Sequence, residues 1–323
     1  MSMRRFSLAV VTTATLLSTA APGLAQAVDA PRTIVQSPGE IAMTQPTKSS
    51  TLKVPGATLY YETRGSGPLL LIIAGGPQDA GVFADVSRQL ADRYTIVAYD
   101  PRGNSRSRFD GEPEPLKLDV QGDDAAALIK ALGGGPAFVF GTSGGAQIGL
   151  NLAARYPELV ATLVAHEPPT TMLLDDPAEA LAADQALYDT YVKEGVEAAM
   201  GQFFAENGLA EGEDQDTAPP EFEPSPEDAE TFGRVSGNFE YWLAHGMLPL
   251  ALYRPDVEAL RHGHPRIIVG IGEQSVGQPI HAMSMALAGK LGIEPVAFPG
   301  DHMGFGPEAE SFAKTLHLVF SSQ

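Results

Sequence analysis

Apolar runs and amphipathic stretches alternate along most of this chain. Five apolar runs have the composition of strands buried on both faces of a sheet, at residues 69–74, 94–99, 137–141, 161–165 and 266–270. Stretches with helical periodicity separate most of these runs, and this alternation predicts right-handed βαβ units and a mostly parallel sheet. Alternating patterns at 51–54 and 58–63 flank Pro55-Gly56 and predict a hairpin at the edge of that sheet.

The alternation stops after Glu167 and resumes near residue 262. Between these points the pattern predicts helices around an acidic, proline-rich loop at 206–226, the helices lying at 177–192, 196–205 and 227–245. A helical segment placed between two strands of one sheet is typical of a cap that covers the strand ends.

We therefore predict an α/β core formed by residues 51–167 and 262–323, with a helical cap at residues 168–261. The cap contains many aromatic residues, most of which we expect to pack in its own core. Trp242 is the only tryptophan of the chain, and we expect it to face a bound substrate.

The first 27 residues have the pattern of a secretory signal peptide. Arg4-Arg5 precedes an apolar stretch at 6–17, and Ala25-Gln26-Ala27 has the form of a cleavage site. A membrane anchor is disfavoured because Thr and Ser interrupt the apolar stretch and Pro22-Gly23 ends it. We expect cleavage after Ala27 and a secreted or periplasmic protein. The ordinary secretory route is favoured, and the paired arginines leave twin-arginine export as the alternative. Residues 28–50 have no sustained periodicity and are predicted to form a flexible leader.

Composition narrows the classes of chemistry and of partner. The chain has no cysteine, which excludes disulfides, thiol nucleophiles and thiolate metal sites. Its 40 acidic and 21 basic residues give a net charge of −19. Such a surface does not attract nucleic acid or anionic membranes, so we expect neither as a partner once the signal peptide is removed. The pattern leaves the oligomeric state open.

The third apolar run ends in the sequence Gly141-Thr142-Ser143-Gly144-Gly145, and a helical pattern at 146–156 follows. A strand, a sharp Gly-x-Ser-x-Gly turn and a helix form the context of a nucleophile elbow, in which Ser143 stands at the carboxyl edge of the sheet. The alternative is a glycine-rich turn whose serine only caps the helix. A base, an acid and an oxyanion hole at the same edge would decide between the two.

His302 is the candidate base among seven histidines. It alone follows a late predicted strand in a short loop between glycines, Gly300 and Gly304, at the sheet edge that carries Ser143. A serine hydroxyl is a weak nucleophile and needs such a base within hydrogen-bonding reach.

Two glutamates are candidates for the acid that orients the imidazole of His302. The usual place for this acid is the loop after 266–270, where an aspartate is expected at Ser275, but a serine supplies no negative charge. Glu273 lies in that loop, and we expect it to point away from His302. Glu167 ends the strand that follows the elbow helix, at the same edge, and is the preferred candidate. The alternative role for Glu167 is a helix cap or a salt bridge.

An oxyanion hole needs two backbone N–H groups aimed at the developing charge. Gly144, directly after the nucleophile, supplies one, and Gly76, in the loop after the first buried strand, is the candidate for the other. The chain has no Gly-x-x-x-x-Gly-Lys loop for nucleotides. His262 and His264 have no further ligands nearby and do not predict a metal site. We expect no cofactor and no metal.

Four segments together make the chain resemble the α/β-hydrolase family, from Thr51 to the C-terminus. They are Ala74-Gly75-Gly76-Pro77, residues 100–107, residues 141–145 and Pro299-Gly300-Asp301-His302. The resemblance implies the α/β-hydrolase fold and a Ser143, His302 and acid triad. Gly75 and Gly76 follow Ala74 where many members have a histidine, so the oxyanion loop departs from the common form.

Within this family the chain most resembles zearalenone lactonase-type hydrolases, which open a macrocyclic resorcylic lactone. The resemblance rests on residues 166–170, which contain Glu167, and on residues 239–242, which end in Trp242. It implies that Glu167 is the acid and that Trp242 lines the substrate pocket. The signal peptide and the acidic loop depart from that group.

These observations lead to one expected function and to alternatives from other classes. The expected function is hydrolysis of a small-molecule ester or lactone through an acyl-enzyme on Ser143. A cofactor-free haloperoxidase or perhydrolase would use the same triad, and a non-catalytic small-molecule binder could keep the fold. Dehalogenase chemistry is disfavoured because it uses an aspartate where this chain has Ser143.

Overall fold

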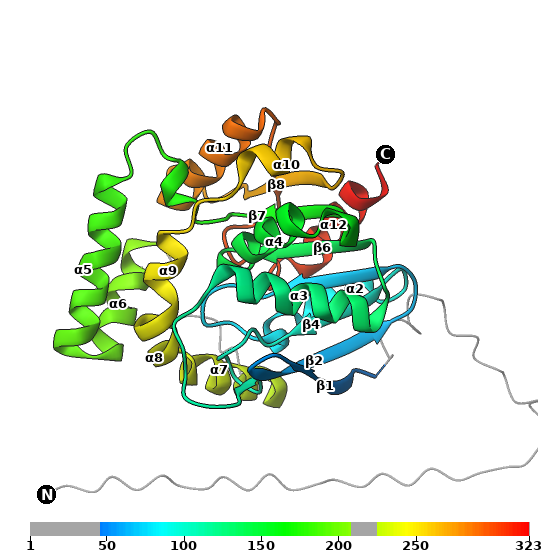
Figure 1. Cartoon of the computed structure of the whole chain (residues 1–323), viewed down its shortest axis with the longest axis horizontal. Helices are drawn as coiled ribbons and strands as arrows, with labels where there is room; N and C mark the ends of the chain where they lie inside the picture. The colour runs from blue at the N-terminus through cyan, green and yellow to red at the C-terminus, as the bar shows by residue number, and fades with distance from the viewer. Residues whose placement is uncertain (1–45, 208–224, 323) are drawn as a thin grey trace, which may run out of the picture. The chain divides into compact units, whose positions relative to one another are not determined.

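The computed structural model describes residues 46–207 and 225–322 (Figure 1). The predicted signal peptide, the leader up to residue 45 and most of the predicted acidic loop lie outside the described residues. None of the helices in the two described ranges is long and apolar enough to cross a membrane.

A nine-stranded sheet in the order β1-β2-β4-β3-β6-β7-β8-β9 forms the centre of the fold, and β5 pairs with β2 (Figure 1). The strands from β3 onward in this order run parallel to β4, which confirms the predicted mostly parallel sheet. The strands are β1 (Lys48–Val54), β2 (Ala57–Gly65), β3 (Leu69–Ile73), β4 (Thr95–Tyr99), β5 (Arg108–Phe109), β6 (Ala137–Thr142), β7 (Val160–His166), β8 (Arg266–Gly272) and β9 (Val296–Phe298).

The edge hairpin of β1 and β2 begins earlier than predicted. Residues 48–50, assigned to the flexible leader, pair with residues 61–63 of β2 and belong to β1. Their side chains are exposed, so the apolar alternation used to find the strand is missing there. Backbone hydrogen bonds to a neighbouring strand are independent of side-chain polarity, and they extend the strand beyond its apolar part.

Helices cover both faces of the sheet, and the side chains of each central strand alternate between the two resulting cores. Leu70 and Ile72 of β3 belong to one core, and Leu71 and Ile73 belong to the other. This alternation explains why the strand reads as a continuous apolar run. The first core is completed by α2 (Ala84–Leu90) and α12 (Ala309–Ser321), and the second by α3 (Leu118–Leu132), α4 (Gly144–Arg155) and α11 (Pro279–Leu291).

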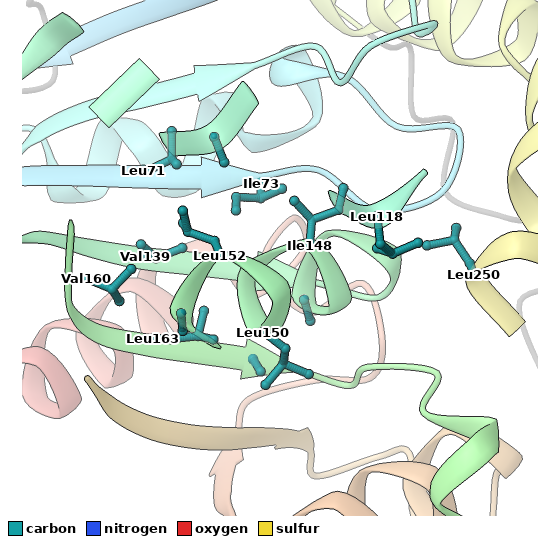
Figure 2. Close-up of a cluster of buried hydrophobic side chains, with 14 of the residues drawn as sticks. Leu71, Ile73, Leu118, Val139, Ile148, Leu150, Leu152, Val160, Leu163 and Leu250 are labelled. Atoms are coloured by element: carbon teal, nitrogen blue, oxygen red, sulfur yellow. The ribbon is translucent and has the colours of Figure 1, made fainter. Parts of the chain in front are cut away.

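The second core reaches from the sheet to the helices that follow β7. In Figure 2, Ile148 and Leu152 of α4 lie against Ile73 and Val139, and Leu250 extends the cluster at the carboxyl ends of the strands. Burying an aliphatic side chain of this size contributes roughly 1.5–3 kcal/mol. The core therefore fixes α4, and with it the turn that precedes α4.

The segment between β7 and β8, which we call the helical insertion (residues 171–262), consists of helices and short connections where the structure describes it (Figure 1). The helix predicted over 227–245 is divided: α7 ends at Gly237, and the π-helical turn η4 begins at Trp242. Turns of this kind are rare and often lie at functional sites. The elements are η3 (Thr171–Leu173), α5 (Ala178–Glu194), α6 (Val196–Glu206), α7 (Pro226–Gly237), α8 (Phe239–Tyr241), η4 (Trp242–Gly246), α9 (Met247–Ala251) and α10 (Val257–His262).

The close packing of α4 on β3 predicts opposite effects for two glycine substitutions. A Cβ on Gly145 of α4 would lie 2.2 Å from the backbone oxygen of Ile73, so Gly145→Ala should lower the free energy of unfolding by about 1–3 kcal/mol. Gly201 of α6 has no atom within 4 Å of its Cβ position, so Gly201→Ala should raise it by about 1 kcal/mol. Urea unfolding of both variants measures the difference, and a stabilising Gly145→Ala would contradict this packing.

Candidate active site

The turn between β6 and α4 holds Ser143 in a strained backbone conformation. Ser143 has φ 54° and ψ −128°, a backbone conformation that residues other than glycine rarely adopt. The turn is tight, because a Cβ on Gly75 would lie 2.7 Å from the Ser143 Cβ. The Ser143 N–H donates to the carbonyl oxygen of His166 at 2.9 Å, which joins the turn to β7. Ser143 thus stands at the carboxyl edge of the sheet and at the positive end of α4.

His302 and Glu167 meet at the same edge of the sheet. The His302 Nδ1 lies 2.7 Å from Glu167 Oε2, and the other carboxylate oxygen accepts from the Gly272 N–H at 2.8 Å. The Glu167 side chain is fully buried, whereas that of His302 is 15 % exposed. Glu167 itself has a positive φ of 45°. Two of the three described non-glycine residues with positive φ are therefore Ser143 and Glu167, and strain of this kind is typical of functional sites.

The pairing with His302 keeps the Glu167 carboxylate charged. Burial by itself raises the pKa of Glu167, but the His302 hydrogen bond, the nearby imidazoles and the Gly272 N–H lower it to about 2. A carboxylate only accepts hydrogen bonds, so the proton of the pair lies on His302 Nδ1. In the neutral imidazole, Nε2 is then the nitrogen that can take up a proton.

The other proposed acid does not take part in this pairing. Glu273 is exposed. Its backbone N–H donates to the backbone carbonyl oxygen of Phe298. Ser275 is fully buried, and its hydroxyl has no hydrogen-bond partner among the described residues. The structure thus brings Glu167, and not Glu273, to His302.

Gly76 and Gly144 lie next to each other above the strand ends. The Gly76 nitrogen is 3.3 Å from the position that a Gly144 Cβ would occupy. Gly76 has φ 46°, in the left-handed region that glycine adopts at low cost. The backbone of Gly76 therefore lies against that of Gly144, the residue after Ser143, where the sequence predicts the oxyanion hole.

A cavity of about 20 Å³ adjoins the two glycines, and Trp242 and Gln121 also line it. Trp242 is 7 % exposed, and its Nε1 lies 3.6 Å from the Cβ position of Gly76. Neither Trp242 Nε1 nor Gln121 Oε1 has a hydrogen-bond partner among the described residues. A buried polar atom without a partner is costly, so both atoms are suited to meet a polar group of a bound molecule.

No group of histidine and acidic side chains within the described ranges could hold a metal ion. His262, which was not expected to bind a metal, is the last residue of α10, and His264 follows that helix. The Nε2 atom of His262 lies 3.4 Å from Glu258 Oε2.

Comparison with known proteins gives a single family. A family model for the alpha/beta hydrolase fold matches residues 68–215. The uncharacterized hydrolase YraK of Bacillus subtilis is 33% identical over 279 residues, which cover 85% of this chain and 97% of that protein. The chain belongs to the α/β-hydrolase family.

Other proteins that resemble this hydrolase in sequence or in structure are also hydrolases. A 2-(acetamidomethylene)succinate hydrolase of Mesorhizobium japonicum is 38% identical over 109 residues, or 33% of this chain and 38% of that protein. Among solved structures, a hydrolase from Pseudomonas aeruginosa superposes with a TM-score of 0.65 at 18% identity, covering 85% of this chain and 99% of that chain. An esterase from Thermogutta terrifontis gives 0.64 at 19% identity, covering 86% and 98%. At these identities the structures show the fold alone.

Two residues of the hydrolase site were missed by the sequence prediction. Gln121 is one polar residue within a helical pattern, and nothing in that pattern marks it as buried. His166 was quoted only as the neighbour of Glu167, yet its ring stacks on that of His302, with centroids 6.4 Å apart. Its Nδ1 lies 3.2 Å from the hydroxyl of Thr142, the residue before Ser143. The pairing of a buried strand residue with a distant loop could not be read from the local sequence.

Burial keeps His166 neutral. Desolvation lowers its pKa from 6.5 to about 3, with the charge of Glu167 opposing the shift and that of His302 adding to it. The unfolded chain therefore takes up a proton at His166 that the folded hydrolase does not. The stability this group contributes is fully present above pH 6.5 and is lost as the pH falls toward 3.

The hydrolase should consequently lose stability on mild acidification, in part through His166. Between about pH 6.5 and 5, the slope of unfolding free energy against pH should be smaller in His166→Phe than in the unchanged protein, by up to about 1.4 kcal/mol per pH unit. Above about pH 7 the two slopes should agree. This pH range lies above 4.5, the ordinary pKa of a glutamate, so that protonation of Glu167 in the unfolded chain does not contribute to the slopes. Urea unfolding gives both slopes, and identical slopes below pH 6.5 would contradict a neutral buried His166.

Proposed function

We propose that this hydrolase cleaves a carboxylic ester or lactone through an acyl-enzyme formed on Ser143. The observation that carries the proposal is the buried hydrogen bond between His302 and Glu167, at 2.7 Å, at the sheet edge where Ser143 occupies its strained turn. A charged carboxylate that fixes the orientation of an imidazole is the arrangement through which that imidazole can activate a serine nucleophile.

In the proposed reaction, His302 Nε2 takes the proton of the Ser143 hydroxyl as the oxygen attacks the carbonyl carbon. The Gly76 and Gly144 N–H groups stabilise the oxyanion that forms. The tetrahedral intermediate collapses, the C–O bond to the alcohol breaks, and His302 gives its proton to the leaving oxygen. A water molecule, deprotonated by His302, then attacks the acyl carbon. The bond from that carbon to Ser143 Oγ breaks, His302 returns the proton to this oxygen, and the acid is released. Glu167 stabilises the imidazolium in both halves.

The proposed substrate class rests on sequence resemblance, whereas the proposed nucleophile rests on the geometry of the site. The resemblance of the segments around Glu167 and Trp242 to zearalenone lactonase-type hydrolases favours a lactone, and Trp242 is the proposed substrate contact. The similar proteins bear other names, among them a 2-(acetamidomethylene)succinate hydrolase and a putative carbamate hydrolase RutD of Azorhizobium caulinodans. An amide or carbamate bond is therefore the main alternative to the ester. We further propose that the hydrolase acts after export, as its N-terminal sequence predicts.

The role of Glu167 predicts a selective loss of activity. Glu167→Gln keeps the size of the side chain but removes the charge that holds the His302 tautomer, and kcat should fall about 10⁴-fold. Glu273→Gln is the matched control in the alternative loop and should change kcat little. Steady-state hydrolysis of a nitrophenyl ester compares the variants, and the reverse order of effects would assign the acid to Glu273.

A substrate panel tests the bond type. We expect turnover of short- and medium-chain nitrophenyl esters and of a resorcylic macrolactone, with no turnover by Ser143→Ala. The corresponding nitroanilides and an aryl carbamate complete the panel. Turnover of only the amide or carbamate would contradict the ester proposal, and ester turnover without lactone opening would reject the lactonase-type substrate. Activity that survives in Ser143→Ala would reject Ser143 as the nucleophile.

A further inference from the structure

The turn that carries Gly76 has three consecutive carbonyl oxygens held by asparagine side chains. Asn104 Nδ2 donates to the carbonyl oxygens of Gly76, at 3.0 Å, and of Gln78, at 2.9 Å. Asn238 Nδ2 donates to the carbonyl oxygen of Pro77, between them, at 2.7 Å. Both asparagines are almost fully buried, at 3% and 5% exposure. The turn is therefore held on its carbonyl side by buried polar side chains.

These contacts bear on the direction of the Gly76 N–H. The Gln78 N–H closes the turn on the Gly75 carbonyl oxygen at 2.9 Å. That carbonyl belongs to the same peptide unit as the Gly76 N–H, and in a planar trans peptide the two groups point in opposite directions. Fixing the turn from its carbonyl side thus fixes the side on which the Gly76 N–H emerges.

Asn238 belongs to the helical insertion and Asn104 to the core. Asn238 lies between α7 and α8. The other hydrogen bonds of its side chain join it to Ser105: Nδ2 donates to the Ser105 hydroxyl at 2.8 Å, and Oδ1 accepts from the Ser105 N–H at 2.7 Å. Ser105 has φ 47°, so a strained residue next to Asn104 is held by the same side chain. The backbone oxygen of Asn238 accepts from the Trp242 N–H at 2.9 Å. One residue therefore contacts the Gly76 turn, the Asn104 loop and the segment that carries Trp242.

A second contact from α7 supports the same turn. Arg234, four residues before Asn238 and on the same side of the helix, donates through Nε to Asp79 Oδ2 at 2.7 Å. Asp79 is fully buried, and its other oxygen accepts from the Gly81 N–H at 2.9 Å. A buried charge needs such a partner to remain in place. Helix α7 is thus fixed to the loop after β3 at two points, one on each side of Gln78.

We infer that Asn238 is a positioning residue for the oxyanion hole and that α7 of the insertion is part of the machinery that sets it. The inference rests on the proposed function, in which the Gly76 N–H binds the oxyanion. The insertion then does more than cover the pocket, because the hole has its full geometry only when Asn238 contacts the turn. Loss of that contact should affect the transition state more than the binding of uncharged substrate.

Asn238→Ala tests the inference through the separation of kcat from KM. With the Pro77 carbonyl released, kcat for a nitrophenyl ester should fall roughly 10- to 100-fold, less than for complete loss of an oxyanion donor, while KM changes by less than about threefold. The affinity for an alkyl boronate, which forms a tetrahedral anion on the serine, should fall with kcat, since it needs the same N–H groups. Thermal unfolding checks that the variant is folded.

Two further variants keep the test decisive. Asn238→Asp retains an acceptor for the Ser105 N–H but has no donor for Pro77, and it should reproduce the loss of kcat even if Asn238→Ala does not fold. Asn207→Ala removes a comparable amide at the end of α6, where it bonds the Phe203 carbonyl oxygen at 2.8 Å, and it should leave kcat unchanged.

The outcomes separate this inference from the proposed function. If Ser143→Ala abolishes turnover while both Asn238 variants keep the kcat and boronate affinity of the unchanged protein, the function stands and the inference is wrong. A rise in KM alone would likewise overturn it, because Asn238 would then act in ground-state binding. If Ser143→Ala is fully active, the proposed function fails, and this role of Asn238 fails with it.

Discussion

The hydrogen bond between His302 and Glu167 joins segments 135 residues apart, and the organisation of the site depends on it. The Glu167 carboxylate is buried, and a buried charge is tolerated only when its oxygens are fully bonded. His302 and the Gly272 N–H provide those bonds. The parallel order β6, β7, β8, β9 brings the three segments to one edge, so the sheet topology is what allows the carboxylate to stay charged and the imidazole to keep one tautomer.

Close backbone packing around Ser143 is the second requirement. Glycines at 75, 141 and 145 lie where any Cβ would overlap neighbouring backbone atoms, and this packing holds Ser143 in a conformation that it would not adopt in isolation. The helical insertion contributes further contacts. Its residues bond the loop after β3 through Arg234 and Asn238, so the core and the insertion together define the space above the strand ends.

Most of the strands and the place of the candidate catalytic residues could be predicted because they depend on local sequence patterns. Apolar runs located the parallel strands, and the elbow sequence marked Ser143 at the end of β6. Strand order also placed Glu167 and His302 at one edge. Other features depend on contacts between distant segments. The start of β1 at Lys48 rests on backbone pairing, and the burial of Gln121, the stacking of His166 on His302 and the bond from Asn238 to Pro77 arise only when the chain is folded. Polar residues in such positions have no periodicity that would distinguish them from solvated ones.

The most direct test of the account is the site of covalent reaction with a fluorophosphonate, read by intact mass and peptide mapping. We expect a single adduct on Ser143 in the folded protein. It should form much more slowly when Glu167 is changed to Gln, because the reaction needs the base that Glu167 orients. An absence of any adduct on the folded protein, or an adduct on a residue other than Ser143, would contradict the claim that this edge of the sheet holds an activated serine.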